Sequence, residues 1–170
     1  VLLDRYRELL ALPVETGLHV ISARVIADLQ SPFVRTLVAN TGHLAGVKEG
    51  QAVIGGSGLI GRIVSVGRVS SRLLLLTDFN SHVPVRIAPN NTRAILSGNN
   101  ADNPVLRFLP KNTVIEEGAE VVTSGDGGQV PIGIPVGVVR VDDDGRLFVD
   151  LQEDLHNLSY VRITSTRDIE

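Results

Sequence analysis

Short stretches in which apolar and polar residues alternate make up most of the chain after residue 18. A period of two places successive side chains on opposite faces, which is typical of β-strands with one buried face. Val, Ile and Thr, which favour strands, are frequent, and Gly, Pro and Asn recur between the stretches. The pattern predicts strands at 19–27, 34–39, 51–54, 59–66, 73–77, 82–88, 93–97, 105–109, 120–123, 134–141, 146–151 and 160–164.

A chain of 170 residues with this many short strands does not fit one small barrel. We therefore expect an all-β fold with two small β-barrels or sandwiches in tandem. The boundary is expected near residue 80, which gives a first β-barrel domain at 14–80 and a second at 81–170. Strands could still cross between the two domains.

An internal repeat supports two units. The sequence EGQAVI at 49–54 resembles EGAEVV at 117–122. Each stretch is followed by a glycine-rich turn and then by an apolar strand, GLIGRIVSV at 58–66 and GIPVGVVRV at 133–141. The repeat indicates that the same strand pair occurs once in each domain.

Residues 1–13 differ from the rest because their apolar positions follow a helical spacing. Leu3, Tyr6 and Leu10 are three and four residues apart, charged residues fill the other face, and Pro13 cannot continue a helix. The spacing predicts a helix of about three turns, which is too short to be stable alone in water. It either docks on its own barrel or forms the C-terminal end of a coiled coil that self-associates through these three residues.

The composition excludes several classes of protein. The chain has no Cys, so it forms no disulfide and holds no thiolate metal site. Its net charge of −3 lacks the Lys and Arg excess of a nucleic-acid-binding surface. No apolar run approaches the roughly 20 residues that span a membrane. Because the chain begins at Val1, we expect it to be part of a longer protein.

Several short motifs resemble catalytic or binding sites but lack residues that the chemistry requires. Gly56, Gly58 and Gly61 form a G-x-G-x-x-G pattern, yet a β-branched strand follows where a dinucleotide site needs a helix. The sequence SGDGG at 124–128 lacks the nucleophilic serine of the protease loop that it resembles. DDDG at 142–145 lacks the spacing of a calcium loop and predicts a hairpin tip. The four His residues show no zinc-site spacing, so we expect neither a metal nor a cofactor.

A strand-rich chain without a recognisable catalytic site is expected to act by binding. Three classes of function stay open from the residues alone. The chain could be a non-enzymatic scaffold, a protease-like β-barrel hydrolase with an unrecognised site, or a cell-wall-binding module for carbohydrate or peptide.

A set of short motifs runs in one order along residues 18–165. They are VIAD at 25–28, Pro32-Phe33, NTG at 40–42, GVKEG at 46–50, GLIGRIV at 58–64, LLTD at 75–78, VPV at 83–85, AILSG at 94–98, VVTSG at 121–125 with Gly128, and PIGIPVG at 131–137. Each motif is weak alone, but in this order and spacing they resemble the MreC family of bacterial rod shape-determining proteins. One departure is Gln129-Val130, where the family tends to place an aromatic residue before the proline.

The resemblance implies the periplasmic part of a single-pass inner-membrane protein, with a coiled coil followed by two β-barrels. The barrels would be similar to those of chymotrypsin-like proteases without the catalytic groups. Residues 1–13 would be the C-terminal end of the coiled coil, and membrane contact would come only through a helix upstream of this chain.

The same resemblance implies a scaffold of the cell-elongation complex and no enzymatic activity. Such a scaffold forms dimers that can assemble further, and it binds and activates a class B penicillin-binding transpeptidase. It also contacts MreD and other proteins of the complex. It thereby helps to maintain rod shape by supporting side-wall peptidoglycan synthesis.

We expect partner contacts at apolar side chains beside turns, because aromatic residues are enriched at the centre of interfaces. The candidates for partner binding are Phe33, Arg35, Arg72, Phe79 and Val83. Many glycines are instead expected to serve turns or close contacts between strands. These glycines are Gly42, Gly46, Gly50, Gly58, Gly61, Gly118, Gly125, Gly133 and Gly137.

Overall fold

The structure is a computed structural model that describes residues 18–128 and 130–166. Within these residues it contains twelve strands and one short 3-10 helix, η1 (His43–Ala45). Every predicted strand is present, with ends that shift by up to two residues. The predicted helix at 1–13, with Leu3, Tyr6 and Leu10, lies outside the described residues. No helix in the described part of the chain is long and apolar enough to cross a membrane.

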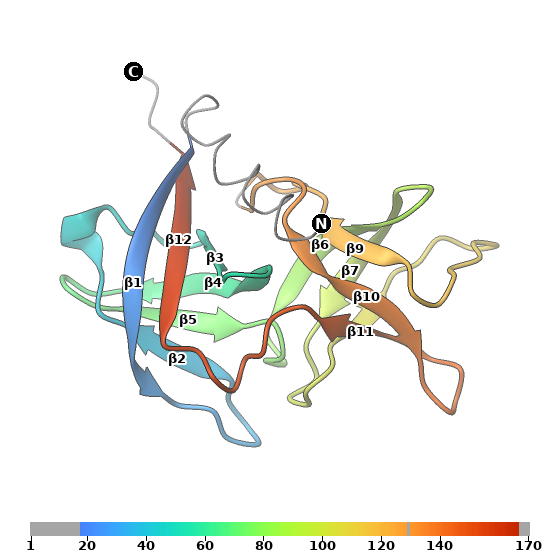
Figure 1. Ribbon diagram of the computed structural model, residues 1–170, viewed down its shortest axis with the longest axis horizontal. Coiled ribbons are helices and arrows are strands. Elements are labelled where there is room, and N and C mark those ends of the chain that lie inside the picture. The colour runs from blue at the N-terminus through green and yellow to red at the C-terminus, as the bar shows by residue number, and fades with distance from the viewer. Residues whose placement is uncertain (1–17, 129, 167–170) are drawn as a thin grey trace.

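Two closed barrels lie side by side (Figure 1). The first has the strand order β1-β12-β3-β4-β5-β2, and the second has the order β10-β11-β8-β7-β6-β9. The predicted all-β fold with two barrels in tandem is therefore confirmed. The first barrel is built from β1 (Leu18–Asp28), β2 (Thr36–Ala39), β3 (Ala52–Ile54), β4 (Leu59–Val66), β5 (Ser71–Leu75) and β12 (Tyr160–Thr166). The second is built from β6 (His82–Ile87), β7 (Thr92–Ser97), β8 (Val105–Arg107), β9 (Glu120–Thr123), β10 (Pro135–Val141) and β11 (Leu147–Leu151).

The last strand, β12, belongs to the first barrel. It pairs with β1 over the register Leu18↔Thr166 to Arg24↔Tyr160, and with β3 through Ile163↔Val53. The second domain expected at 81–170 included this strand, with the reservation that strands could cross between the domains. β12 is such a strand, so the second barrel is inserted between β5 and β12 of the first.

The barrel interiors hold the alternating apolar residues of the strands. The buried residues of both barrels form one continuous cluster. Closure leaves no free lateral edge within either barrel, because each strand pairs on both sides. Side chains that are at most 1% exposed include Leu37, Ile63, Leu73, Leu75 and Ile163 in the first barrel, and Val85, Ile87, Leu96, Val136, Val139 and Val149 in the second.

The repeat in the sequence corresponds to one hairpin geometry used twice, in β3–β4 and in β9–β10. The Gly50 N–H donates to the Ile63 carbonyl at 2.8 Å, and the Gly118 N–H donates to the Val139 carbonyl at 2.7 Å. Both glycines have φ of 88°, a left-handed conformation that glycine adopts without steric cost. Each hairpin also has a register shift at the same place.

Gly61 and Gly137 occupy equivalent positions beside these register shifts. A Cβ on Gly61 would overlap the Leu74 carbonyl oxygen, and one on Gly137 would overlap the Asp150 carbonyl oxygen. Each glycine thus allows the next strand of its barrel to approach closely. The absence of a side chain is therefore a requirement of barrel closure at both positions.

Gly61→Ala should lower the free energy of unfolding by about 1–3 kcal/mol, because the new methyl group forces the β4–β5 backbones apart. Gly56→Ala is the matched control, since a Cβ at Gly56 would meet nothing within 4 Å. The control should change stability by less than about 0.5 kcal/mol. Urea denaturation of both variants measures the difference, and equal midpoints would contradict this account of Gly61.

Candidate functional site

The glycine-rich turn between β3 and β4 joins the first barrel to the β11–β12 connection. One carboxylate oxygen of Glu153 accepts the Ser57 N–H, and it also accepts the Gly58 N–H at 3.1 Å. A Cβ on Gly55 would overlap this carboxyl group, and one on Gly58 would overlap the Pro135 carbonyl of the second barrel. The turn leads directly into β4, so the stretch that resembles a dinucleotide motif is a structural turn, as predicted.

A second carboxylate, that of Asp78, organises the connection between β5 and β6. Asp78 is 3% exposed. Its Oδ2 accepts the Arg35 N–H at 2.8 Å, and its Oδ1 accepts the Asn80 N–H at 2.8 Å. The Arg35 guanidinium donates to the Asn100 carbonyl at 2.8 Å. These bonds tie the β1–β2 loop to the connection between the barrels.

The side chain of Asn100, in the β7–β8 connection, bridges two loops of the chain. Its Oδ1 accepts the Phe79 N–H at 2.8 Å, and its Nδ2 donates to the Phe33 carbonyl at 3.3 Å. Its own N–H donates to the Thr77 carbonyl at 2.8 Å. One amide from the second barrel thus fixes the backbone at both phenylalanines.

The two phenylalanines that Asn100 positions are exposed to solvent. Phe33 is 83% exposed and Phe79 is 63% exposed, and Val34 beside them is 42% exposed. We call these three side chains the Phe33–Phe79 surface. Large apolar side chains that are held by fixed backbone and left in contact with water are typical of protein interaction sites.

The other predicted partner-binding residues lie elsewhere or are already bonded. The Arg35 guanidinium is half-buried and bonds within the chain. Arg72 is exposed in the middle of β5, where it lies opposite Val38 of β2. Val83 is 2% exposed and packs inside the second barrel, so its side chain is not available to a partner. The structure therefore brings together Phe33, Arg35 and Phe79, and corrects the expectation for Val83.

Sequence reasoning missed Asn100 and Glu153, which do most of the bridging at the seam. The only signal for Asn100 is its place after Gly98 and Asn99, which predicts a turn. Nothing in that pattern shows that its side chain reaches Phe33, 67 residues away in sequence. Glu153 gives no signal, since it is one acidic residue in a polar stretch.

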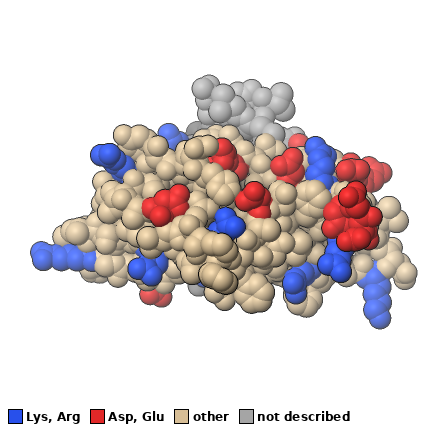
Figure 2. Space-filling model, turned by 90° about the horizontal axis from the view of Figure 1, so that it is seen from below, with Lys and Arg blue, Asp and Glu red and all other residues tan. Residues whose placement is uncertain are grey.

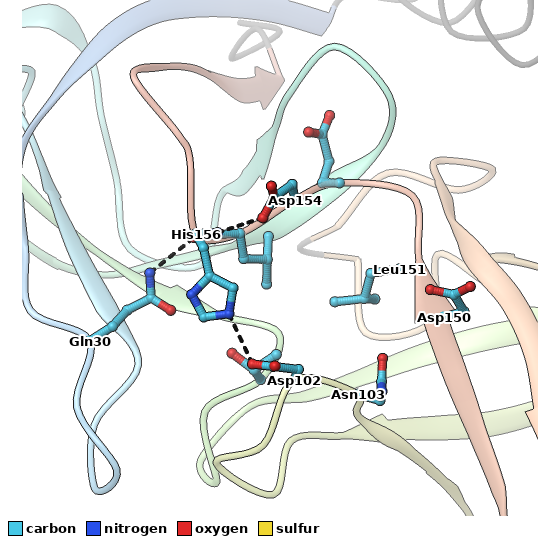
Figure 3. A pocket seen from close by; sticks show the side chains of 10 residues that line it. Gln30, Asp102, Asn103, Asp150, Leu151, Asp154 and His156 are labelled. Atoms are coloured by element: carbon cyan, nitrogen blue, oxygen red, sulfur yellow. Dashed lines mark hydrogen bonds and ion pairs between the residues drawn. The ribbon is translucent and has the colours of Figure 1, made fainter. Parts of the chain in front are cut away.

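A cavity of about 160 Å³, which we call the inter-barrel cavity, lies at the seam (Figure 3). In it, His156 Nε2 lies 2.9 Å from Asp102 Oδ1, and both side chains are more than half exposed. The pKa of Asp154 is lowered by a hydrogen bond from the Asn157 side chain and by one from the His156 N–H. The cavity is lined by Gln30, Thr77, Asp102, Asn103, Asp150, Leu151, Glu153, Asp154, Leu155 and His156.

A His–Asp pair between two barrels is one part of a hydrolase site, so the position of a nucleophile matters. The only hydroxyl among the lining residues belongs to Thr77, and its Oγ1 makes no hydrogen bond to any described residue. A hydroxyl nucleophile needs a base within hydrogen-bond reach. Ser124 bonds instead to Asp126 at 2.9 Å, within its own turn. Among the described residues, the structure therefore assembles no nucleophile–base–orienter set.

The acidic stretch at 142–145 forms a hairpin tip, as predicted. Asp142 Oδ1 accepts the N–H groups of Asp144 and Arg146, each at 2.9 Å, and Gly145 has φ of 79°. The carboxylate therefore serves the turn. No group of three or more His, Cys, Asp or Glu side chains that could hold a metal ion occurs in the described part of the chain.

Asn100→Gly should destabilise the chain by about 1–3 kcal/mol, because it leaves a buried-side N–H and carbonyl without partners. Asn112→Gly is the matched control. Both asparagines have positive φ, 59° and 61°, so glycine relieves the same backbone strain, and Asn112 is exposed. Thermal unfolding compares the two variants, and an equal change in both would show that the Asn100 bridge adds no stability.

Comparison with known proteins agrees with the fold. A family model described as the barrel core of the rod shape-determining protein MreC matches residues 25–165. The cell shape-determining protein MreC of Caulobacter vibrioides is 44% identical over 165 residues, which cover 97% of this chain and 48% of that protein. The chain thus spans about half the length of this relative.

Two solved structures share the two-barrel architecture. One is described as the major periplasmic domain from the cell shape-determining filament MreC; it has a TM-score of 0.76 and 26% identity, and the match covers 88% of this chain and 99% of that one. The other is a complex between penicillin-binding protein PBP2 and MreC from Helicobacter pylori, with a TM-score of 0.69 and 16% identity over 89% of this chain and 99% of that one. The second likeness shows the fold alone. The match across the barrel core places the chain in the MreC family of rod shape-determining proteins.

Proposed function

We propose that this chain is a non-enzymatic scaffold of a periplasmic cell-elongation complex, and that it binds a class B penicillin-binding transpeptidase. Membership of the MreC family supports this role. A complex of a penicillin-binding protein with a protein of the same fold supports the choice of partner. Binding would hold the transpeptidase in a form that supports side-wall peptidoglycan synthesis. MreD is a further partner in this proposal, and an upstream helix would anchor the protein in the inner membrane.

The observation that carries the proposal is the Phe33–Phe79 surface. Phe33 and Phe79 are mostly exposed although Asn100 fixes the backbone of both. A fixed backbone lowers the entropy lost on binding, and aromatic side chains are frequent among the residues that dominate binding energy. Arg72 is exposed on the same barrel and could extend the contact.

Neither alternative function gains a specific observation. A protease-like hydrolase would need a nucleophile beside His156, and the described residues provide none in hydrogen-bond contact. A carbohydrate-binding module commonly uses aromatic side chains that line a cleft. Among the lining residues of the inter-barrel cavity there is no aromatic ring apart from the His156 imidazole.

The double variant Phe33→Ser with Phe79→Ser should weaken binding to a purified transpeptidase ectodomain by at least about tenfold, or about 1.4 kcal/mol. Phe108→Ser is the control, since Phe108 is 80% exposed on the second barrel. Isothermal titration calorimetry measures both, and circular dichroism checks that both remain folded. Unchanged binding in the double variant, or an equal loss in the control, would overturn the assignment of this surface.

Self-association through Leu3, Tyr6 and Leu10 also remains part of the proposal. These residues lie outside the described part of the chain, so their helical spacing alone supports it. A helix of about three turns dimerises weakly. Sedimentation velocity should therefore show a monomer or weak dimer, and Leu3→Asp with Leu10→Asp should abolish any dimer. A tight dimer that survives this change would mean that the barrels carry the contact.

A further inference from the structure

The inter-barrel cavity opens where the β8–β11 pairing stops. The Val149 N–H donates to the Pro104 carbonyl at 2.9 Å. Proline has no N–H with which to return the second bond of that pair, so the ladder ends there. β11 continues to Leu151, and Asp102 and Asn103 line the cavity opposite its last residues. A covalent feature of the sequence, Pro104, thus separates the two segments.

The cavity is acidic. Its lining includes the carboxylates of Asp102, Asp150, Glu153 and Asp154, and it includes no Lys or Arg. His156 is the one lining group that can become a cation, and it bonds to Asp102. The loops that line the cavity lie along the lower side of Figure 1, which Figure 2 views directly, and acidic side chains spread across the middle of that face.

One of the four carboxylates has no partner. Asp102 bonds to His156, Glu153 accepts two backbone N–H groups, and Asp154 accepts from Asn157. Asp150 has no side-chain hydrogen bond or ion pair to any described residue. In the view of Figure 3 it lies across the cavity from Gln30. The site therefore holds a negative charge that the described chain does not compensate.

Buried oxygen atoms at the cavity also lack hydrogen-bond donors. Thr77 is 3% exposed and lines the cavity, and its Oγ1 has no partner among the described residues. The Gln30 Oε1 is likewise buried without a partner, although its Nε2 donates to the Leu155 carbonyl at 2.9 Å. Buried polar atoms are nearly always bonded in folded proteins. Two unbonded oxygens at one acidic cavity indicate that donors arrive from outside.

We propose that the inter-barrel cavity binds the guanidinium group of an arginine side chain from a partner protein. A guanidinium carries a positive charge and five N–H donors in one plane, and this matches a free carboxylate with unbonded oxygens on more than one side. The inference rests on the proposed scaffold function only in that the occupant is a protein. The two sites are separate, since none of the side chains of the Phe33–Phe79 surface lines the cavity.

The occupant would contact both barrels at once. Gln30 comes from the β1–β2 loop of the first barrel, and Asp150 comes from β11 of the second. A bound arginine would therefore hold the seam in the conformation that presents these groups together. Binding at this cavity and the relative position of the barrels are coupled in this arrangement.

Titration of the isotope-labelled chain with N-acetyl-arginine amide, followed by NMR, tests the proposal. We expect saturable shifts at residues 102–103 and 150–156. N-acetyl-citrulline amide, which has the same shape without the charge, should bind at least tenfold more weakly. Shifts without saturation, or equal binding of both compounds, would overturn the proposal.

Two variants locate the binding. Asp150→Asn should weaken binding of N-acetyl-arginine amide about tenfold or more, while Asp142→Asn at the hairpin tip should leave it unchanged. An equal loss in both would show general attraction to an acidic surface and would overturn the assignment. The Phe33→Ser with Phe79→Ser variant should bind N-acetyl-arginine amide as the parent chain does. Failure of the transpeptidase experiment and failure of this one are therefore distinguishable.

Discussion

The pairing of β1 with β12 is the constraint on which the arrangement of the molecule depends. It joins strands from the two ends of the described chain over the register Leu18↔Thr166 to Arg24↔Tyr160 and closes the first barrel. Everything between β5 and β12 must then leave that barrel and return to it. The second barrel is the inserted part, and both of its connections pass the seam. This explains why the bridging residues of the molecule gather there.

Each of the two connections is held by a carboxylate that accepts backbone N–H groups. Asp78 serves the outgoing connection and Glu153 serves the returning one. Backbone in a connection cannot use a strand ladder, so its donors need other partners. An ionised carboxylate is a strong acceptor for them. The same connections also carry or position the Phe33–Phe79 surface and the inter-barrel cavity, so the fold and its proposed binding sites share one set of interactions.

The sequence pattern was sufficient for the strands and for the hairpin that occurs twice, because both depend on local alternation and on glycines at tight contacts. It could not assign β12 to its barrel, since a period of two predicts a strand but not its neighbours. Asn100 was beyond its reach for a similar reason, because its partners are distant in sequence. Val83 is a different case. It shares a period of two with the buried Val85 and Ile87, so the alternation itself places it inside the barrel.

The insertion of the second barrel has a mechanical consequence. A domain joined by one linker can swing and twist about that linker in any direction. Here two chain segments cross the seam, one before His82 and one after Leu151. Two crossing points define an axis, so the easy motion is a hinge opening about that axis, and twisting is opposed by both segments. A protease that cut one of them would leave the barrels attached through the other.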